Sequence, residues 1–290
     1  MARTGKDKDK NHSDEEEDPG KEFVEKTERD VKACLSRAGT ITIPAQSRLV
    51  ALMAEKQFQA FMDIDGSTGS ASLLVNGYEP VEVEMSPFSF LGAKLYEMAT
   101  SVRKNRPYVL AYFCDEHRAF SIKGSETCKP VGMMLSLLGQ LAEQMVERGV
   151  PVDLSSLENK EWRMVRKHGI PTLGRVFEIL ARQPPPGSNV YCIIDEVTHY
   201  EQPVISTDLE NILWGLAGIV EEFEEKGESE FKLLVMTRGQ ARGIGGAFAG
   251  RTIDLPENVE ARDSSQAEIE NLGKGEAKRG EKGKKGKASS

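Results

Sequence analysis

Three apolar segments, separated by helical stretches, constrain the fold of this chain more than any other feature. The segments YVLAYFC, VYCIID and FKLLVMT begin at Tyr108, Val190 and Phe231, and they are apolar nearly throughout. Short runs of this kind are typical of strands that are buried on both faces. Parallel strands need long crossover connections, which the intervening stretches supply. The sequence therefore predicts an α/β fold, with a mainly parallel sheet and helices on both faces.

The remaining elements follow from residue spacing. Ala71–Asn76 is expected to form the first strand, and Arg251–Leu255 a short last one. Upstream of the sheet, apolar residues at helical spacing predict a helical pair over residues 21–38 and 46–62. Within the sheet region we expect helices, one or two in the third case, over residues 88–102, 130–148, 160–182 and 207–225.

Changes in composition divide the chain into a folded part and two tails. Both ends are polar and strongly charged, a composition that is typical of disorder. A lysine-rich end can contact RNA or a membrane, but a solvated tail is the commoner case. The predicted divisions are a disordered acidic tail (1–20), a helical segment (21–69), an α/β domain (70–256) and a disordered Gly/Lys/Glu-rich tail (257–290).

Composition also limits the partners and the compartment. The net charge of the chain is −8, and no predicted folded segment is basic enough to favour a nucleic-acid partner. No apolar run is long enough to cross a bilayer, and the first residues lack the apolar stretch of a secretory signal. Cys34, Cys114, Cys128 and Cys192 are scattered, without the spacing of a zinc site. We expect a cytoplasmic protein with reduced, structural cysteines.

The pair Asp195-Glu196 directly follows the second of these apolar strands. Open α/β sheets bind ligands at the carboxyl ends of their strands, so the two acids lie where a site is expected. In a Walker-B pair the Asp helps to hold Mg²⁺, and the next acid orients the attacking water. The alternative is that acids follow a buried strand simply because the chain returns to water there.

Three blocks of the sequence share a characteristic order and spacing. They are ASLLVNG with SPFSFLGAKLYEMA, YVLAYFCDEH with the helix from Pro130, and VYCIIDEVTHYE with FKLLVMTR. Over roughly residues 70–256, this order of elements resembles the nucleotide-binding module of STAND-class P-loop NTPases, the NACHT-like kind found in fungal proteins. The resemblance implies Mg²⁺ at Asp195, a water-orienting role for Glu196, and nucleotide contacts from Asn76, Gly77 and Arg238. Arg238 could instead pair with a nearby acid such as Asp195.

The chain departs from this family where the phosphates would bind. An active loop needs G-x-x-x-x-G-K-[ST], whose backbone N–H groups and lysine hold the phosphates. No GK[ST] occurs here, and the segment after Gly77 carries three glutamates and two prolines instead. Prolines lack N–H donors, and carboxylates repel phosphate. Lys94 lies too far along the next helix to replace the loop lysine, so we expect it to be a solvated helix charge.

Three further segments have competing interpretations. His199 lacks an identifiable nucleophile beside it, which favours an exposed loop histidine. Gly239–Gly250 is rich in glycine but fails the G-x-G-x-x-G spacing, which favours a flexible loop over a phosphate cradle. Asp63–Gly69 lacks the Gly and Glu of a calcium loop. It resembles the phosphate hairpin of sugar-kinase or actin-like ATPases only weakly, and a polar linker is favoured.

Two functions remain for this pattern of residues. The first is a non-catalytic regulatory or scaffold protein with no cofactor, which binds protein partners through a degenerate NTPase-like domain. The alternative is an ATP- or GTP-binding NTPase that uses Mg-ATP and an unorthodox phosphate loop. A weaker third idea is self-association through the acidic body and the lysine-rich tail.

Overall fold

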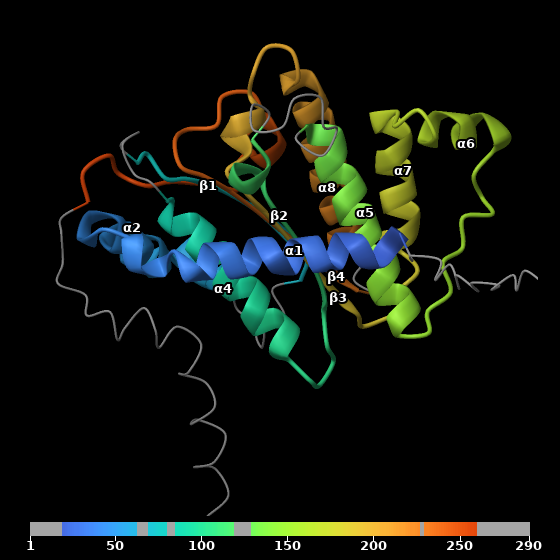
Figure 1. The fold of residues 1–290 in the computed structure, drawn as a ribbon, viewed down its shortest axis with the longest axis horizontal. Coiled ribbons are helices and arrows are strands. Elements are labelled where there is room, and N and C mark those ends of the chain that lie inside the picture. Colours follow the sequence, from blue (N-terminus) through green and yellow to red (C-terminus); the bar gives the residue numbers. More distant parts are fainter. Residues whose placement is uncertain (1–18, 63–68, 80–84, 119–128, 227–228, 260–290) are drawn as a thin grey trace, which may run out of the picture.

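A five-stranded, wholly parallel sheet forms the centre of the computed structural model (Figure 1). The structure describes residues 19–62, 69–79, 85–118, 129–226 and 229–259. The strand order is β2-β3-β4-β1-β5. The predicted α/β fold with a parallel sheet is therefore confirmed. The strands are β1 (Ala71–Asn76), β2 (Tyr108–Phe113), β3 (Asn189–Asp195), β4 (Glu230–Thr237) and β5 (Thr252–Asp254).

Helices cover both faces of the sheet (Figure 1). Helices α5, α7 and α8 pack on one face of the sheet. Apolar residues of α1 to α4 pack together with strand residues on the other face. In the described ranges, no helix is long and apolar enough to cross a membrane. The helices are α1 (Pro19–Ser36), α2 (Ile43–Ala54), α3 (Lys56–Met62), α4 (Pro87–Ser101), α5 (Pro130–Glu147), α6 (Asn159–Val165), α7 (Ile170–Ala181) and α8 (Ser206–Lys226).

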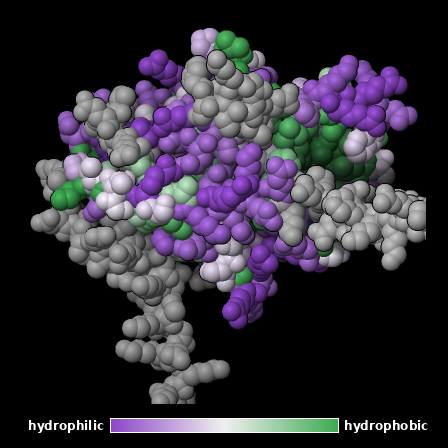
Figure 2. Space-filling model, in the orientation of Figure 1, coloured by the Kyte–Doolittle hydropathy of each residue, from purple (hydrophilic) through white to green (hydrophobic). Residues whose placement is uncertain are grey.

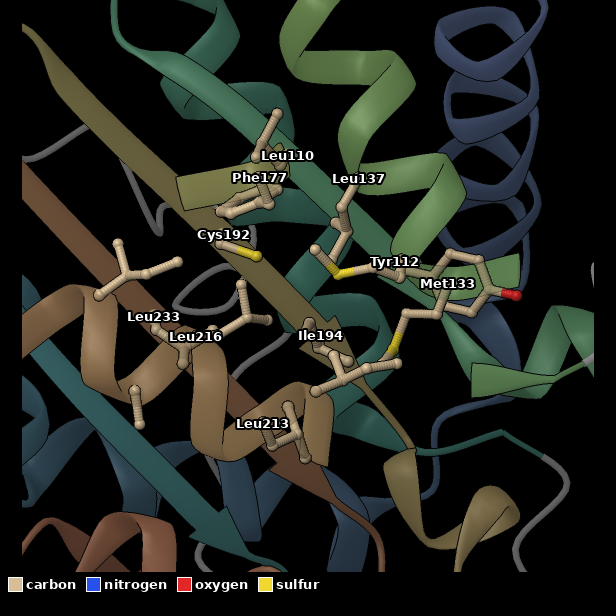
Figure 3. Close-up of a cluster of buried hydrophobic side chains, with 14 of the residues drawn as sticks. Leu110, Tyr112, Met133, Leu137, Phe177, Cys192, Ile194, Leu213, Leu216 and Leu233 are labelled. Carbon is tan, nitrogen blue, oxygen red and sulfur yellow. The ribbon is translucent and has the colours of Figure 1, made fainter. Parts of the chain in front are cut away.

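Alternate residues of each central strand enter different cores, because successive side chains point to opposite faces. In β2, Leu110 and Tyr112 contribute to the core beneath α5, α7 and α8, whereas Val109 and Ala111 contribute to the opposite core. Figure 3 shows Leu110 and Tyr112 in the first core together with side chains of α5, α7, α8, β3 and β4. Burial on both faces explains why these strands are apolar at nearly every position.

Two glutamines of α5 close the free edge of β2. Gln140 donates to the carbonyl of Ala111 and accepts from its N–H, both at 2.9 Å. Gln144 makes the same pair of bonds with Val109, at 2.8 and 3.0 Å. The two side-chain amides thus supply the hydrogen bonds that a neighbouring strand would have made.

Helix α1 crosses α4 and α5 beside this edge of the sheet (Figure 1). Its Asp30 bonds His117 at 2.8 Å, just beyond the end of β2. Phe23 of α1 lies directly against Gly139 of α5, where a Cβ would come within 2.3 Å of the ring. The N-terminal helices therefore pack on the same body as the sheet.

The predicted helices upstream of the sheet differ from the structure at three points. The single helix expected over residues 46–62 is wrong, because α2 and α3 are separated at Glu55, whose backbone is extended. Helix α2 also begins earlier, at Ile43, where Pro44 occupies the first turn and needs no N–H partner. The predicted first helix extends from Pro19 to Ser36 rather than from 21 to 38.

Further along the chain, residues 160–182 contain two helices, α6 and α7. Cys114, expected within a strand, instead begins the short 3-10 helix Cys114–His117, although it is buried as predicted. Cys34, Cys114 and Cys192 are free thiols within the described part of the chain. Cys128 lies outside the described residues, as do positions 1–18 and 260–290 of the two predicted tails.

Candidate functional site

The predicted site residues meet where the carboxyl ends of β1, β3 and β4 lie side by side. The register places Asn76 opposite Thr237, and Asp195 opposite Met236. Helix α4, which follows β1, packs on one face of the sheet. The segment that follows β4 packs on the other face, beside α8. Neighbouring strands whose connections leave on opposite faces create the crevice in which open α/β sheets bind ligands.

Asp195 ends β3 and is completely buried. Its Oδ2 atom accepts a hydrogen bond of 2.5 Å from the hydroxyl of Ser89, in the first turn of α4. In an active P-loop enzyme, the loop Ser or Thr and the Walker-B Asp both hold Mg²⁺. Here the hydroxyl and the carboxylate bond each other directly.

Glu196 is buried as well, and its backbone is left-handed, with φ +56°. This conformation costs a non-glycine residue roughly 1 kcal/mol, so surrounding contacts must hold it. Its N–H donates to the carbonyl of Met236 at 2.9 Å. That bond continues the β3–β4 pairing by one residue, and the left-handed backbone of Glu196 then turns the chain into the 3-10 helix Val197–Tyr200.

Arg238 follows β4 and lies between two buried acids. Its Nε is 3.8 Å from Oε2 of Glu79 and 3.8 Å from Oε2 of Glu196. The expected pairing of Arg238 with an acid is therefore found, but with these two glutamates rather than with Asp195. Glu79 was not predicted as a site residue, because the sequence alone did not show that the chain after β1 stays beside β4.

Residues 77–79, the described start of the chain after β1, do not form a phosphate loop. They continue alongside the end of β4, so that the N–H of Gly77 donates to Thr237 at 2.9 Å and that of Glu79 donates to Arg238 at 2.8 Å. The N–H of Tyr78 is directed to the carbonyl of Gly239 at 3.5 Å. In a P-loop such N–H groups bind phosphate oxygens. Residues 80–84 lie outside the described ranges.

Gly77 is a position where no side chain fits. A Cβ there would lie 2.2 Å from the ring of Phe88 and within 3 Å of the carbonyl oxygens of Thr237 and Arg238. The Phe88 ring is fully buried. Glycine is needed here so that the backbone can approach an aromatic ring, whereas P-loop glycines allow it to approach a phosphate.

Asn76 and Arg48 stabilise this arrangement. The Asn76 amide donates to Asp254 at 2.7 Å, and its oxygen accepts the N–H of Ala241 at 3.0 Å. Arg48 of α2, which is buried, donates to the carbonyl oxygens of Gly77, Pro256 and Glu257. Asn76 and Gly77 were expected to contact a nucleotide, and both instead bond other parts of the chain.

The start of α4 also differs from a phosphate site. Ser86 caps the helix by accepting the N–H of Phe88 at 3.2 Å, and Pro87 occupies the first turn without an N–H. Lys94 forms an exposed ion pair with Glu97 at 2.8 Å, so it is a helix-surface charge as predicted. Among the described residues, those that follow β1 and begin α4 therefore do not reproduce the donor groups with which a P-loop binds a Mg²⁺-bound triphosphate.

Burial raises the pKa values of three acids at these strand ends, Glu79, Asp195 and Glu196. Burial, together with the charge of Glu196, raises the pKa of Glu79 to about 8. The pKa of Asp195 is raised by the same two causes, and burial raises the pKa of Glu196 despite the attraction of Arg238. Glu79 is therefore largely protonated at neutral pH. At Glu79 the expected repulsion between a carboxylate and phosphate is therefore weaker than the sequence suggests, and the Phe88 ring against Gly77 is the stronger barrier.

His199 joins the network rather than standing in an exposed loop, which corrects the expectation for it. Its Nε2 is 2.8 Å from Oδ1 of Asp115 and 3.8 Å from Oε2 of Glu196. Burial raises the pKa of Asp115, but hydrogen bonds from His199 and Arg118 outweigh it and lower the pKa to about 2. Asp115 was missed as a site residue, although it follows β2 much as Asp195 ends β3.

The glycine-rich segment after β4 does hold an anion, but one that belongs to the chain. The carboxylate of Glu201 accepts the N–H groups of Arg242 and Gly243, at 2.8 and 2.9 Å. The space considered for a phosphate is thus occupied by a side chain. The other candidate phosphate segment, Asp63–Gly69, lies almost entirely outside the described residues.

No protein family model matches this chain, and a search of curated proteins found no match either. Within the described ranges, no group of three or more His, Cys, Asp or Glu side chains is arranged to hold a metal ion.

Proposed function

We propose that this chain is a non-catalytic regulatory or scaffold protein, built on an NTPase-like domain that does not bind nucleotide. The observation that carries the proposal is the closed end of β1. The ring of Phe88 is packed against Gly77, and the N–H groups of Gly77 and Glu79 are bonded to β4. Catalysis of phosphoryl transfer depends on positioned donors around the phosphates, and the described residues of this edge offer none in that position.

The Ser89–Asp195 hydrogen bond supports the proposed descent from a P-loop NTPase, the class to which STAND proteins belong. A hydroxyl in the first turn of the first helix and an acid ending a neighbouring strand are the two protein ligands of Mg²⁺ in P-loop enzymes. In this chain the two groups occupy corresponding elements and bond each other at 2.5 Å. The bond stabilises the junction of α4 and β3, which is a structural role for a pair that would otherwise bind metal.

The proposal includes a reducing, cytoplasmic setting and protein partners. Three of the four cysteines are buried free thiols in the described part of the chain. Burial raises the pKa of Cys34 to about 12, which keeps that thiol protonated and unreactive. The partners of a scaffold protein would bind its outer helices, because the edge that binds ligands in such folds is closed.

Calorimetric titration of the full chain with Mg·ATP and with Mg·GTP tests the proposal. The expected result is a flat titration, both for the natural chain and for Asp195→Asn, which keeps the shape of the buried side chain. Micromolar binding that disappears in Asp195→Asn would overturn the proposal and establish the alternative, an NTPase with an unorthodox phosphate loop. Thermal unfolding of both proteins serves as the control that the variant folds.

A further inference from the structure

Helix α6 is an element that the two cores of the protein do not require. It lies between α5 and α7 in the connection from β2 to β3, although a parallel crossover needs only about a dozen residues. Helices α5 and α7 both contribute buried residues to a core, whereas no residue of α6 is buried. Figure 1 shows α6 beyond α7, on the side away from the sheet. Packing of the core therefore does not explain why the chain forms this helix.

Specific contacts nevertheless hold α6 in a fixed position. Its first turn has a capping box, in which the Glu161 carboxylate accepts the N–H of Glu158 at 2.8 Å. The same carboxylate pairs with Arg175 of α7 at 2.7 Å. After the helix, the N–H of Gly169 donates to the carbonyl of Met164 at 2.9 Å. These contacts determine which side of α6 faces α7.

The outer surface of α6 and of the turn after it is basic. Residues 159–168, which we call the α6 arm, carry four Lys or Arg and one Glu, a net charge of +3, although the whole chain carries −8. All four basic side chains are exposed, and none of them forms an ion pair with a described residue. Elsewhere, exposed bases such as Arg118 and Arg182 do pair with acids. Figure 2 shows the arm as a mainly hydrophilic lobe at the upper right. The four bases are Lys160, Arg163, Arg166 and Lys167.

Two large apolar side chains lie among these bases. Trp162 is 37% exposed and Met164 is 41% exposed. Tryptophan, arginine and methionine are enriched in protein–protein interfaces, and tryptophan and arginine are frequent among the residues that contribute most to binding. The α6 arm therefore has the composition of a surface that binds a protein carrying acidic side chains.

Two other kinds of anionic partner fit the α6 arm less well. Glu161 faces α7 and Val165 packs against the core, so Arg163, about 200° around the helix from each, lies on the outer side. A helix that binds a membrane surface presents apolar residues on that side. Nucleic acid carries phosphates along its whole length, and the net negative charge of the chain would repel the phosphates beyond the arm. A short acidic segment of a protein avoids both objections.

We infer that the α6 arm binds an acidic segment of a partner protein. A partner of this kind belongs to the proposed scaffold function, on which the inference rests. The four bases pair with carboxylates of the segment, and Trp162 and Met164 contact apolar side chains that lie between those carboxylates. Such a small helix makes a weak contact, whose rate of formation the opposite charges increase.

Fluorescence anisotropy of a labelled peptide, titrated with the full chain, tests the inference. The probe repeats the triplet glutamate-glutamate-leucine, and its control has glutamine in place of every glutamate. The acidic peptide alone should bind, and more weakly as salt is raised. The double variant Arg163→Glu, Arg166→Glu should bind it at least about tenfold more weakly. The double variant Arg103→Glu, Lys104→Glu makes the same change of charge in an exposed turn outside the arm, and it should bind like the natural chain. Thermal unfolding checks that both variants fold.

Trp162 supplies an independent measurement. The chain has two tryptophans, so in the variant Trp214→Phe the emission comes from Trp162 alone, and it should move to shorter wavelength as the acidic peptide binds. Trp162→Ala should weaken binding about tenfold.

Three results would overturn the inference. The first is the absence of salt-sensitive binding of the acidic peptide, and the second is equal weakening by the two double variants. The third is tighter binding of single-stranded RNA or of phosphatidylserine vesicles that Arg163→Glu, Arg166→Glu abolishes, because it would assign the arm to another class of partner. Binding of Mg·ATP would overturn the proposed lack of nucleotide binding and leave the peptide result unchanged, so the two failures are distinguishable.

Discussion

Gly77 and Phe88 show how two residues change what the end of a strand can bind. The ring of Phe88 is fully buried against the backbone at Gly77. A phosphate-binding loop would hold the oxygen atoms of a phosphate at this position. An aromatic ring offers no charge to a phosphate, and its removal would leave a cavity in the core rather than a binding site. Gly77 serves close packing here, so a glycine at a strand end is not by itself a sign of phosphate binding.

We predict that Gly77→Ala destabilises the protein by at least about 2 kcal/mol, because the added methyl group would overlap the Phe88 ring and two carbonyl oxygens. Urea unfolding measures the change. Gly218→Ala in α8 is the matched control, since its Cβ meets nothing within 4 Å and alanine favours a helix. It should stabilise the protein by about 0.5–1 kcal/mol. Equal effects of the two substitutions would contradict the packing described at Gly77.

Glu79 makes stability depend on pH. Its pKa is raised from the ordinary 4.5 to about 8, so between these values the folded state holds a proton that the unfolded state has released. The contribution of Glu79 is therefore fully present below about pH 4.5 and is lost as the pH rises through about 8.

Glu79→Gln removes this dependence, because the amide stays neutral at every pH. The variant should gain stability relative to the natural chain as the pH rises from 5 to 9, by an amount on the order of 2–4 kcal/mol. Unfolding free energies measured at several pH values give the difference. If the two stability curves run parallel across this range, Glu79 is not protonated in the folded state.

At the scale of elements, β2 depends on α5 for the backbone hydrogen bonds on the side that faces away from β3. The strand pairs with β3 on one side, and Gln140 and Gln144 of α5 bond its other side. An unpaired strand edge is a template for aggregation, and natural proteins cover such edges. The sequence predicts the helix over residues 130–148, which the structure contains as α5. It does not show that the two buried glutamines of this helix form hydrogen bonds with the backbone of β2.

Gln140→Ala should cost about 2–4 kcal/mol, because it leaves the N–H and the carbonyl of Ala111 buried without partners. Gln140→Glu should cost at least as much at neutral pH, since a buried carboxylate accepts the N–H but repels the carbonyl oxygen of Ala111. Urea unfolding and light scattering on storage check both the stability and the exposed edge. Gln59→Ala, at an exposed glutamine of α3, is the control and should change little. A Gln140→Ala protein as stable as this control would refute the role of the edge bonds.

At the scale of the whole molecule, Arg48 connects parts of the chain that are far apart in sequence. One guanidinium bonds the backbone after β1 and the backbone after β5 at the same time. A planar group with several donors suits this role, whereas a lysine offers a single point charge. Arg48 therefore connects helix α2 both to the chain that follows β1 and to the chain that follows β5.

Arg48→Met should loosen the last strand before the rest of the sheet. Hydrogen exchange is expected to accelerate in residues 252–257 and to remain slow in β3 and β4, which lie farther inside the sheet. Arg48→Lys should behave more like the Met variant than like the natural chain. Arg118→Met, at an exposed ion pair beyond β2, provides the comparison, and its exchange in residues 252–257 should be unchanged.

The sequence alone determined the class of fold and the edge at which the acidic residues gather. Strands buried on both faces must be apolar throughout, and the spacing between them leaves room only for helical crossovers. Asp195, Glu196 and Arg238 were placed at one edge for the same reason, since parallel strands end on the same side of a sheet. The absence of GK[ST] was also visible from the sequence.

Only the tertiary structure decided what fills the place of the missing loop. Phe88, Arg48 and Glu79 act there through contacts between segments far apart in the chain, and residue spacing carries no information about such contacts. The bonds of Gln140 to β2 and of Glu201 to the glycine-rich segment are of the same kind. Periodicity identifies which side of an element is buried, whereas the partner of each polar group depends on how all the elements pack together.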